Sequence, residues 1–342
     1  MTLGGLELPA AAVSGDHAHG ASVSAAAVGG RPEIENPISG WTWCGHKHLG
    51  DYRCGPYIAA MSKTKNRRQK AGVTLAQDLD RYDLYLRSVQ EPAHEVEFFD
   101  KVYCERHGGP PLTLREDFCG TFAVCCEWVR SHPNRRAIGV DLDPEPLDWG
   151  RRHNLALLPV EARQRVECKK VDVRTVARIK SDILAAQNFS FWIFKTRSEL
   201  LGYFKKAYAN ISDGGIMVLD MMGGWECYER MDDVRKIEAD GPGKPGFKYV
   251  WEQVGYNPVN HDASFYIHFR FHDGSEQHRA FEYHWRFWTI PEVRELLDEA
   301  GFSGTGVYWE GEDENGEGDG QWQRVESAKS DPSWIAYIVA VK

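Results

Sequence analysis

The stretch from Leu114 to Asp141 holds residues whose types and spacing suit ligand binding. Cys119-Gly120-Thr121 predicts a tight turn between an apolar segment and a helical pattern. Glycine in such a turn lets the backbone approach a ligand closely, and the following helix offers free N–H groups. Asp141 follows Gly120 by 21 residues and ends a second apolar segment. A carboxylate there can accept hydrogen bonds from both ribose hydroxyls. These features predict an adenosine-containing ligand at the carboxyl edge of a sheet.

Two classes of adenosine cofactor could use this turn. A dinucleotide needs the spacing GxGxxG, so that its pyrophosphate can sit on the helix N-terminus. This chain has Phe118 and Phe122 around the turn, where a glycine-rich loop has glycine. The aromatic rings leave little room for a pyrophosphate, whereas a methionine-type tail carries no phosphate. The turn therefore favours S-adenosylmethionine over a dinucleotide, with a Rossmann oxidoreductase as the rival interpretation.

The segment resembles class I S-adenosylmethionine-dependent methyltransferases. These enzymes carry an acidic residue, a Gly-Cys-Gly-Thr-Gly-like turn and an acidic residue that closes the second strand; Phe118 and Phe122 depart from this pattern. The resemblance covers residues 75–342 and implies that Asp172 and Val173 contact adenine. The cofactor-binding residues that it predicts are Tyr85, Glu116, Cys119, Gly120, Thr121, Asp141, Leu142, Asp172, Val173 and Asn188.

Alternating strand and helix patterns surround these residues, which predicts a doubly wound α/β fold with a parallel core. Together with the resemblance, the pattern predicts a seven-stranded Rossmann-like methyltransferase fold. It has an antiparallel β insertion before the last helix. The predicted strands span 112–116, 137–140, 166–171, 183–187, 216–220, 307–309 and 334–341, and an acidic glycine-rich loop covers 311–320. Helices are expected over 75–89, 96–107, 200–211 and 289–301, among others.

The insertion, residues 247–288, is rich in aromatic side chains. Three strands are expected there, over 247–254, 263–271 and 278–288. In the last of these, alternation places either Tyr283, Trp285 and Phe287 or the residues between them on the inner face. The resemblance implies that such an insertion forms a lid over the acceptor pocket.

Candidate acceptor-side residues lie after the fourth strand and in the insertion. Asn188 can orient a nucleophile and Phe189 can stack on it, unless this is an ordinary loop with a capping Asn. Tyr283 and Arg286 are further substrate-binding candidates, Arg286 for a carboxylate. His284 is the catalytic candidate, as a general base, against the alternative of a surface histidine.

The helix that carries Tyr82 and Tyr85 has two possible positions. In similar enzymes an N-terminal helix closes over the cofactor. The alternative is that both tyrosines simply pack against the sheet.

Composition limits the partners. Asp and Glu total 50 against 41 Lys and Arg, for a formal net charge of −9, which does not favour a large nucleic-acid interface. The chain lacks an apolar stretch of membrane-spanning length and a secretory signal pattern, and its irregularly spaced cysteines are typical of reduced thiols. We therefore expect a cytoplasmic protein.

Residues 1–70 are expected to form a flexible or disordered leader, and 71–342 the methyltransferase domain. The leader includes a basic run at 63–70 (KTKNRRQK) and a loose Cys/His group that lacks the close pairs of a zinc site. That group comprises Cys44, His46, His48 and Cys54. No metal site is predicted.

The expected function is methyl transfer from S-adenosylmethionine to a small molecule. The alternatives are a methyltransferase that acts on tRNA or protein, with the basic run as an anchor, and a non-catalytic adenosine-binding protein.

Overall fold

The computed structural model describes residues 72–314, 316 and 318–342. The leader, its basic run and the group of Cys44, His46, His48 and Cys54 lie outside the described residues. Among the helices described, none is long and apolar enough to cross a membrane.

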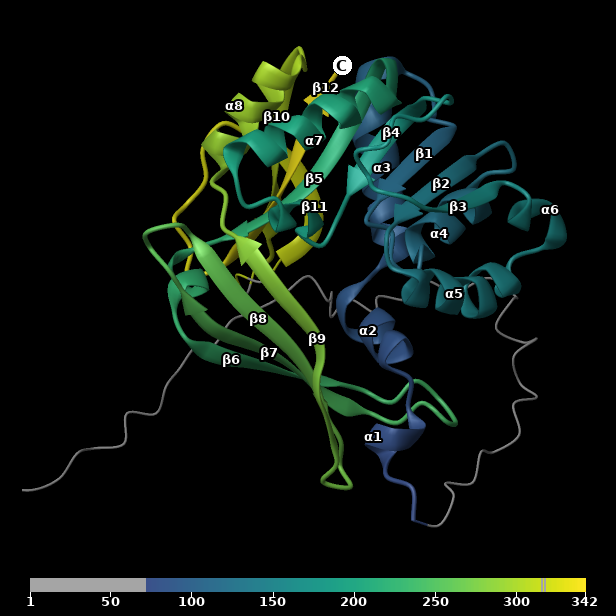
Figure 1. Ribbon diagram of the computed structural model, residues 1–342, viewed down its shortest axis with the longest axis vertical. Helices are drawn as coiled ribbons and strands as arrows, with labels where there is room; N and C mark the ends of the chain where they lie inside the picture. Colours follow the sequence, from purple (N-terminus) through teal and green to yellow (C-terminus); the bar gives the residue numbers. More distant parts are fainter. Residues whose placement is uncertain (1–71, 315, 317) are drawn as a thin grey trace, which may run out of the picture. The chain divides into compact units, whose positions relative to one another are not determined.

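A large mixed sheet confirms the expected α/β fold (Figure 1). Its strand order is β11-β10-β12-β5-β4-β1-β2-β3. The five strands from β5 to β3 are parallel, and β12 joins β5 antiparallel. The strands are β1 Thr113–Asp117, β2 Arg136–Asp141, β3 Val166–Lys170, β4 Ser181–Ala186, β5 Ile211–Gly223, β10 Gly304–Glu312, β11 Gly318–Val325 and β12 Trp334–Val341.

The sheet has an eighth strand where the sequence predicts a loop. Residues 311–320 were expected to be an acidic loop, but both ends of this segment belong to strands, since β10 runs to Glu312, β11 begins at Gly318, and the two pair as a hairpin. Trp322 anchors the hairpin, because its ring is 2% exposed and its Nε1 donates to Nε2 of His94, 2.9 Å away. The buried side chain of Trp322 thus stabilises a strand next to a segment whose composition is typical of a loop.

Helices cover both faces of this sheet, and each face has its own hydrophobic core cluster. Ile183 and Ala185 of β4 face the cluster beneath α3 and α4, whereas Leu184 and Ala186 face the cluster beneath α7 and α8. The helices are α1 Leu75–Asp78, α2 Arg81–Val89, α3 Pro92–His107, α4 Ala123–Ser131, α5 Pro144–His153, α6 Val160–Arg163, α7 Arg197–Asn210 and α8 Ile290–Ala300. Short 3-10 turns lie at η2 Leu155–Leu157, η3 Ser190–Ile193 and η4 Trp225–Tyr228.

The helix expected over 75–89 is divided in two. Asp80 causes the break, because its Oδ1 accepts hydrogen bonds from the backbone of Tyr82 and Asp83 and caps α2. The N–H of Leu75 and the side chain of Gln277 join α1 to the β8–β9 hairpin. These contacts fix where α2 begins.

The insertion forms a second, antiparallel sheet in the order β6-β7-β8-β9 (Figure 1). Its strands are β6 Met231–Ile237, β7 Phe247–Tyr256, β8 Asp262–Arg270 and β9 Glu276–Arg286. The sheet therefore starts at Met231 rather than at 247. Strand β6 was missed because it is a half-exposed edge strand with charged side chains and no continuous apolar run.

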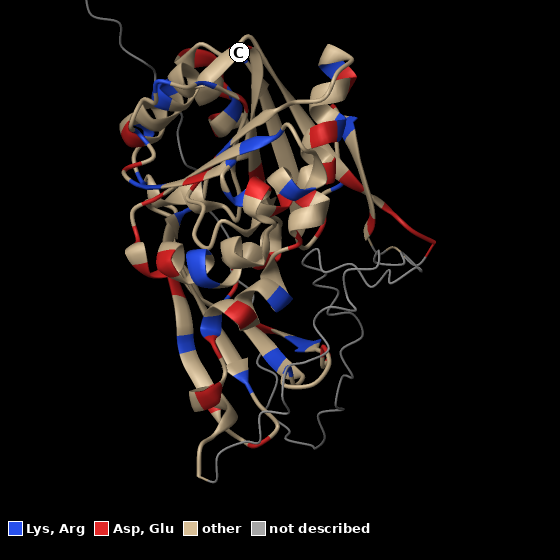
Figure 2. Cartoon of the chain, turned by 90° about the vertical axis from the view of Figure 1, so that its right-hand side faces the viewer, with Lys and Arg blue, Asp and Glu red and all other residues tan. Residues whose placement is uncertain are grey.

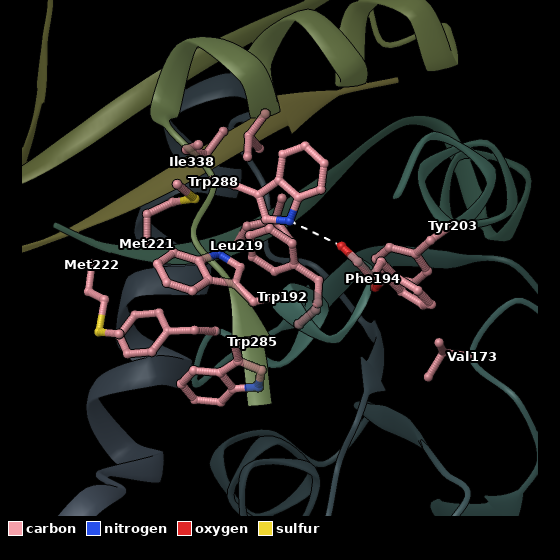
Figure 3. Packing of buried hydrophobic residues seen from close by; sticks show 14 of the residues in the cluster. Val173, Trp192, Phe194, Tyr203, Leu219, Met221, Met222, Trp285, Trp288 and Ile338 are labelled. Atoms are coloured by element: carbon pink, nitrogen blue, oxygen red, sulfur yellow. Dashed lines mark hydrogen bonds between the residues drawn. The ribbon is translucent and has the colours of Figure 1, made fainter. Parts of the chain in front are cut away.

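Aromatic side chains join the second sheet to the first. Figure 3 shows Trp192, Trp285 and Trp288 gathered beside Met221 and Met222. The Nε1 of Trp288 donates to the carbonyl oxygen of Phe194 over 3.2 Å, the dashed line in Figure 3. This shared core fixes the position of β9 against the carboxyl ends of the parallel strands.

Gly150 of α5 allows this helix to approach the turn after β1. A Cβ there would lie 2.3 Å from the carbonyl oxygen of Thr121 and 2.5 Å from the ring of Phe122. We expect Gly150→Ala to lower the free energy of unfolding by about 1–3 kcal/mol, the usual cost of overpacking. Urea denaturation followed by circular dichroism measures it.

The control is Gly202→Ala in α7, where an added Cβ meets nothing within 4 Å. There, alanine should raise stability by about 0.5–1 kcal/mol through helix propensity. Equal effects of the two substitutions would contradict the tight contact at Gly150.

Candidate functional site

A cavity of about 480 Å³ opens at the carboxyl edge of the parallel strands. The turns after β1, β2 and β4 form its floor, and α2 and β9 form its walls. This is the place at which open α/β sheets bind ligands. The second sheet borders the cavity through its edge strand β9.

The turn after β1 contains three residues with left-handed backbone conformation. Phe118, Gly120 and Phe122 have φ values of 59°, 49° and 47°. The two phenylalanines thus adopt the conformation that glycine usually adopts, at about 1–2 kcal/mol each. Phenylalanine thus occupies two of the three left-handed positions in this turn, and glycine only one.

Neither phenylalanine fills the cavity. Phe122 is fully buried and contacts Gly150, on the side of the turn away from the cavity. Phe118 lines the cavity and packs against Phe194 and Tyr203, with ring centroids 6.1 and 5.7 Å away. Above Gly120, an added Cβ would meet nothing within 4 Å, so the turn faces open space.

Asp141 connects the ends of β1 and β2. Its Oδ2 accepts a hydrogen bond from the N–H of Gly120 at 2.8 Å, and its Oδ1 accepts one from Asp143 at 2.9 Å. Each oxygen keeps one lone pair, because a carboxylate oxygen can accept two hydrogen bonds. The carboxylate can therefore hold the turn and still accept two ligand hydroxyls.

The structure brings together six of the ten predicted cofactor residues, which line the cavity: Tyr85, Cys119, Gly120, Thr121, Asp141 and Asn188. Glu116 lies behind the turn, where its Oε2 accepts a hydrogen bond from the N–H of Cys125 in the first turn of α4. Burial raises the pKa of Glu116 to about 7. Glu116 thus fixes the start of α4 and does not line the cavity.

Three further residues that were predicted to bind the cofactor do not line the cavity. Leu142 is 60% exposed, an accessible apolar side chain next to Asp141. Asp172 is paired with Arg174 at 2.6 Å, and the Arg174 hydrogen bonds hold the pKa of Asp172 below its usual value. Val173 is buried in the core.

A buried arginine that sequence reasoning missed holds the segment of Asp172 and Val173. Arg115 is 2% exposed and donates to the carbonyl oxygens of Val173 and Thr175 at 2.7 and 3.2 Å. It also pairs with Asp117, which accepts from the hydroxyl of Tyr203. This network joins β1, the segment after β3 and α7. Its only sequence signal is an arginine within a predicted strand.

The end of the cavity near β4 is lined by Asn188, Ser190, Tyr85 and Tyr283. Tyr85 and Tyr283 both border this part of the cavity, and burial raises the pKa of each, that of Tyr85 to about 12. The phenols therefore stay neutral at physiological pH. They can orient an acceptor by hydrogen bonds but cannot serve as ready bases.

Three predicted acceptor-side residues do not line the cavity. On β9 the face with Tyr283 and Trp285 is the inner one. His284 is exposed on the opposite face and bonds to Ser264. Arg286 donates to the carbonyl oxygen of Lys195 and stacks on Trp288 at 3.8 Å. Phe189, in the loop after β4, is 1% exposed in the core.

An arginine that the sequence analysis did not single out closes the cavity on one side. Arg81 of α2 contacts Glu145 of α5 at 2.7 Å, the hydroxyl of Tyr82 at 3.0 Å and the carbonyl oxygen of Ala280 in β9 at 3.2 Å. Tyr82 and Tyr85 both line the cavity and both contact the ring of Phe281. The helix thus covers the site through Arg81 and also packs against the second sheet.

Within the described residues, no group of three or more His, Cys, Asp or Glu side chains could hold a metal ion. The six cysteines described are free. Three of them, Cys119, Cys125 and Cys126, are buried around the turn, where burial raises their pKa values.

Glu95 of α3, a half-buried residue, gives a test of the carboxyl groups behind the site whose pKa values are raised. Removal of water and the nearby Asp220 raise its pKa to about 8, although Tyr337 donates to it. A raised pKa favours the folded state at low pH, so this contribution to stability is present below about pH 4.5 and is lost as the pH rises through 8. We expect Glu95→Gln to flatten the decline of the unfolding free energy between these values.

Denaturation with urea at several pH values measures this slope. The matched control is Glu105→Gln on the same helix, which also accepts a hydrogen bond from a tyrosine hydroxyl. If both variants keep the slope of the parent protein, Glu95 is not its source.

Comparisons with known proteins agree on the fold. No family model matches the sequence, and a search of curated proteins finds no similar sequence. DesVI from Streptomyces venezuelae superposes with a TM-score of 0.56 at 18% identity, over 77% of this chain and 97% of its own.

Two further solved structures are similar. CalS10 with bound S-adenosylmethionine, an amino pentose methyltransferase from Micromonospora echinaspora, gives a TM-score of 0.55 at 16% identity, over 77% of this chain and 97% of that one. An S-adenosylmethionine-dependent methyltransferase from Clostridium acetobutylicum gives 0.52 at 17%, over 76% and 95%. The chain therefore has the fold of S-adenosylmethionine-dependent methyltransferases.

Proposed function

We propose that this protein transfers a methyl group from S-adenosylmethionine to a small-molecule acceptor. The observation that carries the proposal is one cavity that joins two kinds of surface. At one end lie Asp141 and the open turn at Gly120, and at the other lie Asn188 and the pair of Tyr85 and Tyr283. The first suits a nucleoside without phosphates, and the second suits a polar acceptor.

The residues present fit this cofactor. Asp141 retains acceptor capacity on both oxygens for the ribose, and the space above Gly120 is free for a ligand tail. Leu142 offers an exposed apolar surface beside the ribose position. A cavity of about 480 Å³ lies within the range of roughly 300–1,000 Å³ that is usual for small-molecule sites.

The protein's task in such a reaction is orientation. When bound, the cofactor supplies an activated sulfonium methyl that a nucleophile displaces in line. Tyr85, Tyr283 and Asn188 can orient the nucleophile through hydrogen bonds. The helix α2 and strand β9, joined by Arg81, exclude water from the space between them. Because the neutral phenols cannot serve as ready bases, the acceptor that fits best is an amine that binds in its unprotonated form.

The similar structures and the charge distribution both support a small acceptor. CalS10 is described as an amino pentose methyltransferase, and KedS8, a sugar N-methyltransferase from Streptoalloteichus, has a TM-score of 0.50 at 18% identity. Figure 2 shows acidic and basic residues interspersed over the helices and strands in view, with no continuous basic face. A large nucleic-acid partner would require such a face.

The experiment that tests the proposal is a metabolite screen with methyl-labelled cofactor, in which the compound that gains label is identified. Titration calorimetry with S-adenosylmethionine, S-adenosylhomocysteine and NAD is carried out in parallel. Binding of NAD alone would support an oxidoreductase. Binding of the sulfur ligands without transfer to any metabolite or macromolecule would support a non-catalytic binding protein.

Deletion of residues 1–70 separates small from macromolecular acceptors. If the basic run anchors tRNA or protein, the shortened chain should lose affinity for that substrate. An enzyme for small molecules should keep its activity.

Asp141→Ala should weaken binding of S-adenosylhomocysteine by about 1–3 kcal/mol, because the ribose hydroxyls lose their acceptor. Calorimetry measures the change. The control is His284→Ala, which should leave affinity unchanged because this imidazole is exposed away from the cavity. Full affinity in Asp141→Ala would remove Asp141 from the binding site.

A further inference from the structure

The loop after β4 contains two consecutive residues in an unfavourable backbone conformation. Asn188 and Phe189 have φ values of 56° and 53°, in the left-handed region, which asparagine tolerates better than most residues but phenylalanine rarely adopts. Such strain persists only where surrounding contacts enforce it, and it is concentrated at functional sites. Here it lies at the cavity wall, because Asn188 and the adjacent Ser190 both line the cavity.

One buried carboxylate holds both residues. Asp220, at the end of β5, is 7% exposed. Its Oδ2 accepts a hydrogen bond from the N–H of Asn188 at 2.6 Å, and its Oδ1 accepts one from Phe189 at 2.9 Å. Both N–H groups of the strained pair are thereby satisfied by a single side chain from the neighbouring strand.

We propose that Asp220 is a positioning residue for methyl transfer: it fixes the loop that faces the sulfonium end of the cofactor. This inference rests on the function proposed above. The sheet order places β1 between β2 and β4. A ligand with its ribose on Asp141 and its tail along the turn at Gly120 therefore reaches the loop of Asn188 with its reactive end.

The surroundings of Asp220 make its charge sensitive to pH. Tyr85 of α2 and Glu95 of α3 interact with it, and Tyr337 of β12 pairs with it in the sheet and donates to Glu95. Burial raises the pKa of Asp220 to about 7. The ionised carboxylate accepts from both amides, whereas the protonated group keeps one strong acceptor. Above this pH the ionised carboxylate of Asp220 accepts both backbone hydrogen bonds of the loop and places a negative charge next to it.

The resulting preference can be measured without an acceptor. S-Adenosylmethionine and S-adenosylhomocysteine share every group except the methyl and its positive charge. The ratio of their two dissociation constants therefore reports on the sulfonium end alone, and an overall loss of folded protein cancels from it. An ionised Asp220 should favour the cationic ligand.

The decisive variant is Asp220→Asn, in which the amide has one acceptor oxygen for two N–H groups. Binding of S-adenosylmethionine should weaken relative to S-adenosylhomocysteine by about three- to tenfold, because the neutral amide lacks the negative charge that favours the sulfonium. The matched control is Asp182→Asn at the opposite edge of the sheet. Asp182 also accepts two backbone N–H groups, from Leu112 and Thr113, and its substitution should leave the ratio unchanged.

A pH profile provides a second measurement whose first step does not require the Asp220→Asn variant to fold. In a Glu95→Gln background, which removes the neighbouring carboxyl, the preference for S-adenosylmethionine should increase as the pH rises from 6 to 8, through the pKa of about 7 to which burial raises Asp220. Adding Asp220→Asn should abolish this increase.

The outcomes are distinct. If the parent protein binds neither ligand, the proposed function fails, and this inference fails with it. If both bind, but the ratio is unchanged in folded Asp220→Asn or is constant with pH in Glu95→Gln, the role of Asp220 is overturned while the cofactor assignment stands.

Discussion

The site depends on a turn that reverses the chain between β1 and α4 within a few residues. Three left-handed residues make this reversal, and two of them are phenylalanines. Their strain is offset because each ring packs in a separate core: Phe122 against Gly150 of α5, and Phe118 against Tyr203 of α7. Asp141 then holds the backbone between them at Gly120. The open space above the turn therefore results from packing on both faces of the sheet, and a change in either core would be transmitted to the ligand surface.

The fold was predictable where periodicity and spacing were strong. The alternation of strands and helices gives the parallel core, and the strands that end at the turn and at Asp141 lie side by side as expected. Two strands, β6 and β11, were not predicted from the sequence. Both lie at sheet edges, where many side chains face solvent, so their sequences lack a continuous apolar pattern. The backbone of Phe118 and Phe122 could not be predicted either, because local propensity disfavours the left-handed region for phenylalanine and only tertiary packing overrides it.

The same distinction applies to the site residues. Cys119, Asp141 and Asn188 meet because the carboxyl ends of adjacent parallel strands share one edge, a rule that sequence order alone reveals. His284 and Arg286 belong to an antiparallel strand, where the choice of inner face depends on one residue of register, and their face is turned away from the cavity. Arg115, Asp220 and Arg81 act through contacts between segments far apart in the sequence, for which an isolated residue type gives no signal.

The ionisable groups around the acceptor end divide into two layers. The phenols of Tyr85 and Tyr283 border the cavity and remain neutral, whereas the carboxyl groups of Asp220 and Glu95 lie behind the loop with pKa values raised by burial. The second layer does not line the cavity, and Asp220 is linked to it only through the backbone of Asn188 and Phe189, yet its charge acts there through a medium that screens less than water. Linkage makes the effect reciprocal: if ionised Asp220 favours a cation in the cavity, a cation in the cavity favours ionised Asp220. Conversion of a sulfonium into a neutral thioether would then return a proton to this carboxyl group. The site would therefore bind the cofactor and its demethylated product with different affinities.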